Sequence, residues 1–457
     1  MLEGRLAWVA EATGGELRGA DLRFAGLGTD TRSLNAGELF VALRGERFDA
    51  HELVAEAQAR GAAAAVVDRP VQAPGLPLIV VADTRRALGD LARAWRRRFA
   101  IPVIAITGSN GKTTTKEMVA SILRQQGATL ATLGNLNNDI GVPLTLFRLA
   151  ASDRYAVIEM GANGPDDITS LVAIAEPTVA LVTMCGPAHL QGFGSLDGVA
   201  RAKGQIYSRL NSTHTALINV DDPHHARWQS TASAAHILRF GLGADATVTA
   251  TDIQPGGLGA GSQFRLRVGD EAAMVTLPLD GLHNVRNAVA AAAVGAALDL
   301  PIAVIKAGLE AVPPVKGRLN VRRLPTGATL IDDTYNANPA SLAAALDLLA
   351  TQPGARWLVL ADMGELGPSA VELHRAAGLA ARAAGVSRLF AIGPLAAAAA
   401  EAFGAEALRF TTRDDALAAL REQLTGDVTV LCKGSRSMQL DLLVKALLTP
   451  AEGALCC

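Results

Sequence analysis

A short glycine-containing loop after an apolar run is the pattern with the clearest chemical meaning. A buried strand is predicted at residues 101–107, and a helix is predicted to begin near Lys112. The residues expected to bind phosphate are those of the loop and the first helical turn: Gly108, Ser109, Asn110, Gly111, Lys112, Thr113 and Thr114. Backbone N–H groups of such a turn and the positive end of the helix dipole attract phosphate oxygens. Lys112 would hold the β- and γ-phosphates of a nucleotide, and the Thr113 hydroxyl would reach Mg²⁺.

The loop is shorter than the full phosphate-loop pattern, which has another glycine five positions before the second one. Ile106 stands at that position here. The alternative is a Gly/Asn turn that happens to precede Lys112 and Thr113. The apolar strand before the loop favours the phosphate-binding interpretation, because such loops join a strand to a helix.

Two further polar residues accompany predicted strands. Glu159 lies at the end of the apolar run 155–160, and His189 follows the run 179–184. Parallel α/β sheets bind ligands at the carboxyl ends of their strands, so both residues are candidates for the same site. A carboxylate oxygen suits a hard cation, which makes Glu159 a candidate Mg²⁺ ligand. The alternatives are a carboxylate that caps the next helix and a histidine with ordinary loop hydrogen bonds.

Alternating strand-like and helical segments place these residues in an α/β fold. Short buried strands are predicted at residues 101–107, 155–160, 179–184, 215–220, 357–360, 388–392 and 428–431. Helices are predicted between several of them, including residues 113–126 and 197–210. This alternation indicates layers of helices on parallel sheets.

The chain length and two junctions predict three domains. At about 150 residues per domain, 457 residues correspond to three. An arginine cluster at residues 96–98 precedes a new strand, and a proline-rich stretch lies at residues 312–317. We therefore predict domains at residues 1–98, 99–313 and 314–457. The arginine cluster itself is expected to be a solvated helix end.

The composition excludes several classes of protein. Hydrophobic residues make up 50% of the chain, and 42 Lys+Arg against 44 Asp+Glu give a net charge of −2, which does not favour nucleic-acid binding. The four cysteines do not have the spacing of a metal site, and their small number predicts a reducing compartment. The sequence indicates no function for Cys456 and Cys457. The first residues lack a signal-peptide core, and the longest apolar stretch, 288–298, is too short to span a bilayer. A cytoplasmic protein without membrane insertion is expected.

Further motifs extend the pattern across nearly the whole chain. They are Glu-Met-Gly-Ala at 159–162, His189 followed by Ala-Lys-Gly-Gln-Ile-Tyr at 202–207, Leu-His-Asn-Val-Arg-Asn-Ala at 282–288, Lys-Gly-Arg at 316–318 and Asp-Asp-Thr-Tyr-Asn-Ala-Asn-Pro at 332–339. Together with the phosphate loop, these motifs and their order resemble the Mur ligase family, the ATP-dependent amide ligases of peptidoglycan precursor synthesis. The resemblance implies a central P-loop ATPase-like domain with a mostly parallel sheet. It also implies a small N-terminal UDP-binding α/β domain and a C-terminal Rossmann-like α/β domain.

The resemblance also implies roles for residues outside the phosphate loop. Lys203 would be carbamylated and, with Glu159 and His189, would hold a second Mg²⁺; the alternative is a helix-surface lysine paired with an acidic neighbour. Asn287 would contact adenine, Arg318 a phosphate and Asp333 the ribose, with the nucleotide between the central and C-terminal domains. The UDP-linked substrate would contact the following residues: Thr29, Asp30, Thr31, Arg32, Asn137 and Asn138. A polar turn between two strands is the alternative for residues 29–32.

Motifs at residues 132–143, 335–341 and 361–367, with His374, resemble the family member that adds D-alanyl-D-alanine. The expected partners are UDP-N-acetylmuramoyl-tripeptide and D-alanyl-D-alanine, joined through an acyl phosphate with ATP and two Mg²⁺ ions, by a monomeric enzyme. The third-residue ligase of the family is the alternative, but its expected His-Thr-Pro-Asp and Asp-Asn-Pro-Arg motifs are absent from the sequence. A folylpolyglutamate-type ligase is less consistent with the motif at residues 29–32. A regulatory nucleotide-binding protein with a degenerate site is less consistent with the intact motif residues.

Overall fold

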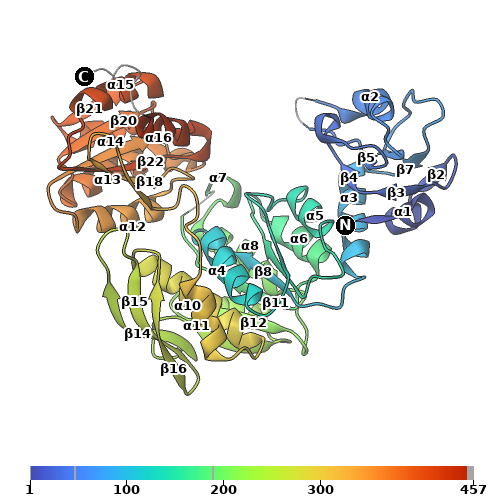
Figure 1. The fold of residues 1–457 in the computed structure, drawn as a ribbon, viewed down its shortest axis with the longest axis horizontal. Helices are drawn as coiled ribbons and strands as arrows, with labels where there is room; N and C mark the ends of the chain where they lie inside the picture. The colour runs from blue at the N-terminus through green and yellow to red at the C-terminus, as the bar shows by residue number, and fades with distance from the viewer. Residues whose placement is uncertain (1, 46–47, 188–189, 450–457) are drawn as a thin grey trace.

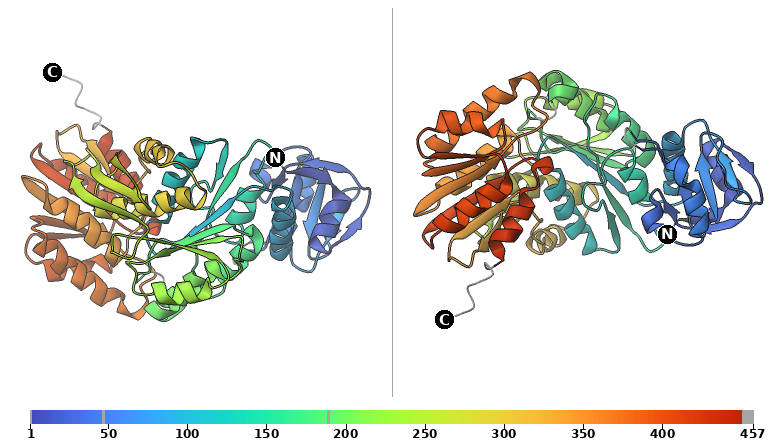
Figure 2. Two further views of the ribbon diagram at one scale, coloured as in Figure 1. Left: turned by 90° about the horizontal axis from the view of Figure 1, so that it is seen from below. Right: turned by 90° about the horizontal axis from the view of Figure 1, so that it is seen from above.

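The computed structural model describes residues 2–45, 48–187 and 190–449 of the chain. Three α/β domains follow one another along the long axis of the molecule, with the N-terminal domain at one end and the C-terminal domain at the other (Figure 1 and Figure 2). Each domain has its own sheet, and most neighbouring strands are parallel. The predicted fold class is therefore confirmed.

The N-terminal domain contains a five-stranded sheet in the order β2-β7-β6-β5-β4 and a separate antiparallel pair, β1 and β3. Only β2 is antiparallel within the larger sheet. The strands are β1 (Glu3–Arg5), β2 (Glu16–Arg18), β3 (Arg23–Ala25), β4 (Leu27–Gly28), β5 (Leu39–Val41), β6 (Ala64–Val67) and β7 (Leu78–Val80). The helices are α1 (Leu6–Thr13), α2 (Val54–Ala59) and α3 (Thr84–Arg96). Every residue of β5 and β6 is buried, as expected of central strands covered on both faces.

Arg96 connects α3 to the central domain. Its buried side chain donates from Nε to the carbonyl of Ala175 at 2.9 Å and from Nη2 to the carbonyl of Glu176 at 3.2 Å. These carbonyls lie at the end of α6 (Asp167–Ala175), where the helix dipole favours a cation. The expectation of a solvated helix end is therefore wrong for Arg96, because an inter-domain contact buries it.

The central domain contains a nine-stranded sheet in the order β16-β15-β14-β13-β12-β11-β8-β10-β9. The strands are β8 (Val103–Thr107), β9 (Thr129–Ala131), β10 (Tyr155–Glu159), β11 (Val179–Val182), β12 (Thr215–Asn219), β13 (His236–Phe240), β14 (Val248–Pro255), β15 (Ser262–Val268) and β16 (Glu271–Leu277). The helices besides α6 are α4 (Lys112–Arg124), α5 (Gly141–Leu146), α7 (Leu190–Phe193), α8 (Leu196–Gly204), α9 (His225–Thr231), α10 (Leu282–Ala297) and α11 (Ile302–Glu310).

The strand order determines which loops meet. β8 lies between β10 and β11, and all three strands are parallel. The loops that follow them therefore leave the sheet at the same edge, which brings Gly108, Glu159 and Thr183 close together. The predicted strands at 101–107, 155–160 and 179–184 are present, with ends shifted by one or two residues.

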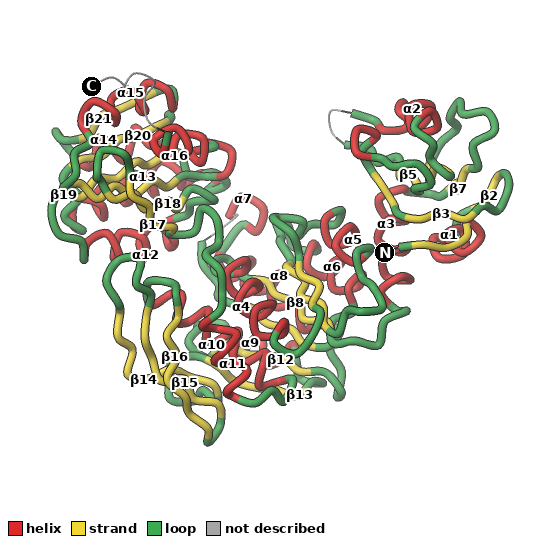
Figure 3. The backbone as a smooth tube through the Cα atoms, in the orientation of Figure 1, coloured by secondary structure: helices red, strands yellow, loops and turns green. Residues whose placement is uncertain are grey.

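The antiparallel extension β14–β16 is not among the predicted strands. In β15, buried and exposed residues alternate, so the sequence lacks the continuous apolar run on which the strand predictions depend. The extension lies beneath the C-terminal domain (Figure 3). Leu258, between β14 and β15, packs against the core of that domain.

The C-terminal domain contains a six-stranded sheet in the order β17-β18-β22-β19-β20-β21, in which only β17 is antiparallel to its neighbour. The strands are β17 (Asn320–Arg323), β18 (Thr329–Asp333), β19 (Ala355–Ala361), β20 (Arg388–Ile392), β21 (Ala407–Phe410) and β22 (Val428–Lys433). The helices are α12 (Pro339–Ala350), α13 (Ala370–Ala383), α14 (Ala396–Phe403), α15 (Arg413–Gln423) and α16 (Leu440–Leu448). Separate apolar cores cover the two faces of this sheet.

The helix predicted at residues 197–210 is interrupted. α8 ends at Gly204, and a 3₁₀ turn at Gln205–Tyr207 follows it. The Tyr207 hydroxyl anchors this turn to the sheet, because it donates to the carbonyl of Leu217 at 2.8 Å and accepts from the N–H of Val182 at 2.9 Å.

No helix in the described part of the chain combines the length and the apolar character needed to cross a membrane. Cys185 and Cys432 are buried free thiols. Cys456 and Cys457 lie outside the described residues.

Candidate active site

Contacts with the residues after β11 fix the backbone of the phosphate loop. Gly108 has a φ of 150°, and a Cβ atom there would lie 1.8 Å from Oγ1 of Thr183, so a larger residue does not fit. Thr183 Oγ1 donates to the carbonyl of Asn110 at 2.6 Å. The N–H of Ser109 donates to the carbonyl of Met184 at 2.8 Å. The loop is thus held from both ends.

Gly111 allows α4 to begin against α10. It has a φ of 81°, and a Cβ atom there would lie 2.4 Å from Oδ1 of Asn287. Asn287 Nδ2 donates to Oδ1 of Asn284 at 3.2 Å, which orients the amide. Thr113 and Thr114 are buried in the first turn of α4. Asn287 therefore lies next to the loop although it is 176 positions from Gly111 in the sequence.

Lys112 folds back over the loop that precedes it. Its Nζ donates to the carbonyl of Gly108 at 2.7 Å. Burial and the charge of Arg318 lower the pKa of Lys112, whereas Glu159 acts in the opposite direction. The ammonium is therefore a desolvated cation that a phosphate anion would stabilise.

Glu159 offers one carboxylate oxygen without a partner. The residue is 1% exposed, and Oε1 accepts a hydrogen bond from Nδ2 of Asn137 at 2.8 Å. Oε2 is buried and has no hydrogen-bond partner within the described ranges. A buried carboxylate oxygen is costly unless a donor or a cation satisfies it. This oxygen therefore fits a cation ligand better than the cap of a helix.

Lys203 is buried on α8. Its exposed fraction is 1%, and Nζ lies 5.9 Å from the centroid of the Phe193 ring. Burial and the charge of Lys112 lower the pKa of Lys203 to about 7, while Cys185 acts in the opposite direction. This environment does not fit the alternative of a surface lysine paired with an acidic neighbour. His189, the remaining predicted metal ligand, lies outside the described residues.

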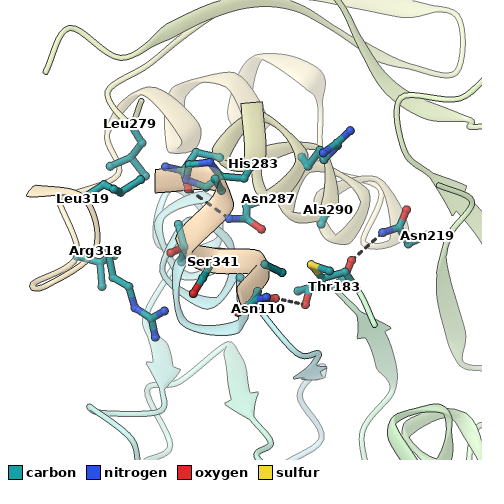
Figure 4. A pocket seen from close by; sticks show the side chains of 18 of the residues that line it. Asn110, Thr183, Asn219, Leu279, His283, Asn287, Ala290, Arg318, Leu319 and Ser341 are labelled. Carbon is teal, nitrogen blue, oxygen red and sulfur yellow. Dashed lines mark hydrogen bonds between the residues drawn. The ribbon is translucent and has the colours of Figure 1, made fainter. Parts of the chain in front are cut away.

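A first cavity, of about 300 Å³, lies between the phosphate loop, α10 and the C-terminal domain (Figure 4). Polar residues from all three segments line it: Asn110, Thr114, Asn284, Asn287, Arg318, Asp333 and Ser341. Its apolar lining includes Phe240, Leu279, Ala290 and Leu319. An apolar pocket with a few polar groups next to a phosphate loop suits a nucleotide base and ribose.

His283 lines this cavity and was not identified from the sequence. It lies in the first turn of α10 beside Asn284. Burial and the charges of Lys433 and Arg286 lower the pKa of His283 to about 4. The ring is therefore neutral near pH 7. The position of His283 within the 282–288 motif was the sequence signal that could have identified it.

Arg318 reaches from the C-terminal domain to the phosphate loop. Nη2 donates to Oγ1 of Thr113 at 3.4 Å, and Cζ lies 4.1 Å from the centroid of the Tyr335 ring. Its Nε is buried without a hydrogen-bond partner among the residues described. The guanidinium thus has donor capacity left for an anion at the loop.

Asp333 is paired with a second buried residue, Lys433. The Lys433 ammonium, on a side chain 2% exposed, donates to Oδ2 of Asp333 and to the carbonyl of Asn336, the latter at 3.1 Å. Both charged residues line the first cavity. The sequence pattern singled out Asp333 but not Lys433, because the pair joins two parallel strands, β18 and β22, that are far apart in the chain.

A second cleft, of about 330 Å³, lies on the other side of the phosphate loop. Residues of the central domain that line it include Ser109, Lys112, Asn137 and Glu159. Residues of the C-terminal domain that line it include Tyr335, Asn336, Gly364, Ser435 and Arg436. Residues 433–438 were not identified from the sequence. Their position after the predicted strand 428–431 was the available signal, because Glu159 was identified from its position at the end of a predicted strand.

His374 supports this cleft from behind. The side chain is fully buried on α13, its Nε2 accepts from the N–H of Met363 at 2.9 Å, and its Nδ1 donates to the carbonyl of Ala370 at 2.6 Å. Both ring nitrogens are therefore used within the protein. His374 fixes the loop 361–367, which contains Gly364.

The structure does not bring residues 29–32 together with the phosphate loop. They lie in the N-terminal domain at the start of a 3₁₀ turn (Thr31–Ser33) and line neither cavity described above. Arg32 pairs with Asp30 at 2.6 Å and lowers its pKa to about 2, and the Arg32 side chain is 85% exposed. Thr31 is buried, and Thr29 is half-buried.

A third cleft, of about 730 Å³, separates α3 from the central domain. Its polar lining includes Arg85, Arg86, Asn137, Asn138, Asp139, Asn163 and Asp167. Asn138 also accepts the N–H of Gly141 at 2.8 Å and so orders the start of α5. Asn137 and the segment 161–163 line both this cleft and the second one. The two clefts are therefore neighbours along one surface.

Three consecutive family models match the chain: Mur ligase family, catalytic domain, at residues 23–96, Mur ligase middle domain at 106–295, and Mur ligase, glutamate ligase domain, at 317–436. The chain is 44% identical over 453 residues to the UDP-N-acetylmuramoyl-tripeptide–D-alanyl-D-alanine ligase of Escherichia coli (strain K12), covering 98% of this chain and 99% of that protein. The chain belongs to the Mur ligase family.

Solved structures agree with this assignment. MurF from Acinetobacter baumannii superposes on this Mur ligase with a TM-score of 0.92 and 38% identity, covering 98% of this chain and 99% of that one. MurF from Thermotoga maritima in complex with ADP gives a TM-score of 0.82 and 26% identity, covering 92% and 96% of the two chains. The predicted family and the three-domain architecture of this Mur ligase are therefore confirmed.

Proposed function

We propose that this Mur ligase joins D-alanyl-D-alanine to UDP-N-acetylmuramoyl-tripeptide, converting ATP to ADP and phosphate. The observation that carries the proposal is the second cleft, where Lys112 and the unpartnered oxygen of Glu159 face the C-terminal motif residues. The full-length similarity to ligases of this specificity supports the choice of substrates. The reaction belongs to peptidoglycan precursor synthesis in the cytoplasm.

Each domain has a separate task in this proposal. Residues 1–98 bind the UDP end of the first substrate through Thr29, Asp30, Thr31 and Arg32. Residues 99–313 bind ATP, and residues 314–457 bind the incoming dipeptide. The neighbouring second and third clefts give the tripeptide a path from the N-terminal domain to the phosphate loop along Asn137 and Asn138. A monomer suffices for this arrangement, since the proposed substrate-contacting residues all belong to one chain.

The nucleotide would occupy the first cavity. Asn287 would contact the adenine, Asp333 the ribose, and Arg318 a phosphate. The backbone and side chains of the loop, from Gly108 to Thr114, would surround the phosphates. The half-buried cations Lys112 and Arg318 would stabilise the charge that develops during phosphoryl transfer, an effect that is large in a site from which water is excluded.

The donor set fits Mg²⁺. Thr113 supplies a hydroxyl oxygen and Glu159 a buried carboxylate oxygen without a partner, both suited to a hard cation. We propose that Thr113, Glu159, His189 and a modified Lys203 hold two ions. When bound, they neutralise phosphate charge and orient the phosphoryl group.

Lys203 would join this set as a carbamate. A pKa of about 7 leaves much of the amine unprotonated at neutral pH, and the free amine is the form that reacts with CO₂. A bond forms between Nζ and the carbon of CO₂, and one proton is released. The product is an anionic oxygen ligand in place of a cation that would repel metal.

The reaction then proceeds in two displacements. The terminal carboxylate of the tripeptide attacks the γ-phosphorus of ATP, giving an acyl phosphate and ADP. The dipeptide amine attacks the acyl carbon, a proton leaves the nitrogen, and phosphate departs from the tetrahedral intermediate. Lys112 and Arg318 counter the negative charge in both steps.

Release of ADP with two substrate pairs tests the proposal. One pair is UDP-N-acetylmuramoyl-tripeptide with D-alanyl-D-alanine, and the other is the UDP-dipeptide with lysine or diaminopimelate. We expect turnover with the first pair only. Turnover with the second pair only would establish the third-residue ligase instead, and substrate-independent ATP hydrolysis would reject both.

A further inference from the structure

Three cationic side chains of the described chain line the second cleft: Lys112, Arg318 and Arg436. Lys112 bonds the Gly108 carbonyl, and Arg318 donates to the Thr113 hydroxyl, so both lie on the side of the phosphate loop. The neighbouring Lys433 is already engaged by Asp333. Arg436, which follows β22, is the cation of this set that no described hydrogen bond ties to the phosphate loop.

The surroundings of Arg436 leave its guanidinium accessible. Its side chain is 61% exposed, and its Nη1 lies 3.5 Å from Oδ2 of Asp441. An exposed pair at this distance contributes little. The guanidinium fork therefore keeps most of its donors for a ligand.

Two loops of the C-terminal sheet hold Arg436 beside the cleft. It begins a 3₁₀ turn (Arg436–Met438) that starts three positions after the end of β22. The preceding Ser435 accepts the N–H of Gly364 at 2.6 Å, and its own N–H donates to the carbonyl of Asp362 at 3.1 Å. These bonds tie the segment 433–438 to the loop 361–367, since β22 and β19 are adjacent and parallel. The backbone under Arg436 is thus fixed.

The distances across the cleft are compatible with a bound dipeptide. The Cζ atoms of Arg318 and Arg436 lie 4.1 Å and 5.9 Å from the centroid of the Tyr335 ring, so the guanidiniums are separated by no more than these two distances combined. An extended dipeptide spans about 7 Å. A dipeptide whose carboxylate lies at Arg436 can therefore extend its amine toward Arg318, on the side of the phosphate loop.

We propose that Arg436 binds the terminal carboxylate of D-alanyl-D-alanine and thereby selects a dipeptide with a free C-terminus. A bidentate guanidinium–carboxylate pair fixes both the position and the orientation of the ligand. The inference rests on the proposed function, because it takes the incoming dipeptide as the occupant of this side of the cleft.

Steady-state kinetics with D-alanyl-D-alanine and with D-alanyl-D-alaninamide test this role. The amide has the same shape but no terminal charge. We expect wild-type enzyme to use the amide about 10- to 100-fold less efficiently, because the charged hydrogen bonds are lost. In the Arg436→Ala variant, kcat/KM for the free dipeptide should fall by a similar factor of about 10- to 100-fold. The ratio of kcat/KM for the free dipeptide to kcat/KM for the amide should be less than about three in this variant. KM values for ATP and the UDP-linked substrate should stay within about twofold.

Arg375→Ala is the matched control. Arg375 is another exposed arginine of the same domain, 47% exposed and 3.3 Å from Glu401, but it lies on α13 outside the lining of the cleft. This variant should keep the full preference for the free dipeptide. Arg436→Gln provides a second substitution in which the aliphatic part of the side chain is retained, and it should behave as Arg436→Ala does.

The two possible failures are distinguishable. If folded Arg436→Ala and Arg436→Gln keep the wild-type preference for the free carboxylate, the role of Arg436 is wrong and the proposed function stands. If the wild-type enzyme does not use D-alanyl-D-alanine and instead adds lysine or diaminopimelate to the UDP-dipeptide, the proposed function is wrong. That result overturns the assignment of Arg436 as a dipeptide anchor as well.

Discussion

The side-chain amides of Asn110 and Asn338 are paired between two domains. Asn338 Nδ2 donates to Oδ1 of Asn110 at 2.8 Å, and Asn110 Nδ2 donates to Oδ1 of Asn338 at 3.4 Å. Asn110 belongs to the phosphate loop. Asn338 caps α12 by accepting the N–H of Ser341 at 2.9 Å. The start of a C-terminal helix is thus linked directly to the loop proposed to bind phosphate.

Two substitutions separate the inter-domain role of Asn338 from its capping role. In Asn338→Ser the shorter side chain can still cap α12 but cannot reach Asn110, so we expect unchanged stability and about a five- to tenfold lower kcat/KM for ATP. Asn338→Ala loses both bonds and should also unfold with about 1 kcal/mol less free energy. Denaturant titration and ATP-dependent ADP release measure the two effects. Equal ATP kinetics in Asn338→Ser and wild type would show that the amide pair does not contribute to nucleotide use.

Sequence patterns predicted the parts of this site that depend on local signals. The apolar run before Gly108, the loop glycines and Lys112 form one continuous segment, and β8 and α4 begin within two residues of their predicted starts. Glu159 was placed correctly at a strand end because its strand is a short buried run. Such features need no knowledge of which strands become neighbours.

Contacts between distant segments could not be predicted in this way. The Asn110–Asn338 pair, the Asp333–Lys433 pair and the burial of Arg96 depend on how sheets and domains pack. β15 was missed because it is buried on one face only, where alternation replaces a continuous apolar run. Arg436 carries no local signal beyond its position after a strand.

Replacing Lys112 by methionine should abolish most activity. The substitution keeps most of the length of the side chain but removes the cation that contacts Gly108 and is proposed to stabilise the phosphates. We expect kcat to fall by about 1,000-fold or more, because several kcal/mol of transition-state stabilisation disappear. Single-turnover formation of ADP is the measurement. Lys306→Met, which removes a lysine paired with Glu310 on α11, should retain normal activity as a control.

If Lys203 acts as a carbamate, a carboxylate supplied from solution should replace it. Lys203→Ala leaves room at a fully buried position, so we expect a loss of at least about 100-fold in kcat and partial recovery with formate or acetate. Lys203→Arg keeps a positive charge and fills the space, and the same acids should not rescue it. The rate of ADP release as a function of acid concentration distinguishes these outcomes. Wild-type rates in Lys203→Ala without added acid would contradict the proposed modification.

The half-buried ring of His283 should make the stability of this Mur ligase fall between pH 6.5 and 4. Its pKa is about 4 in the folded protein and 6.5 when exposed, so between these values the unfolded chain binds more protons. The free energy of unfolding therefore decreases as the pH drops. The titration of His283 contributes about 2 to 3 kcal/mol to this decrease. His283→Gln does not titrate, and its loss of stability over the same range should be smaller by that amount. Urea unfolding without nucleotide at pH 7, 6, 5 and 4 provides the comparison, and parallel pH profiles for the two proteins would refute the assignment.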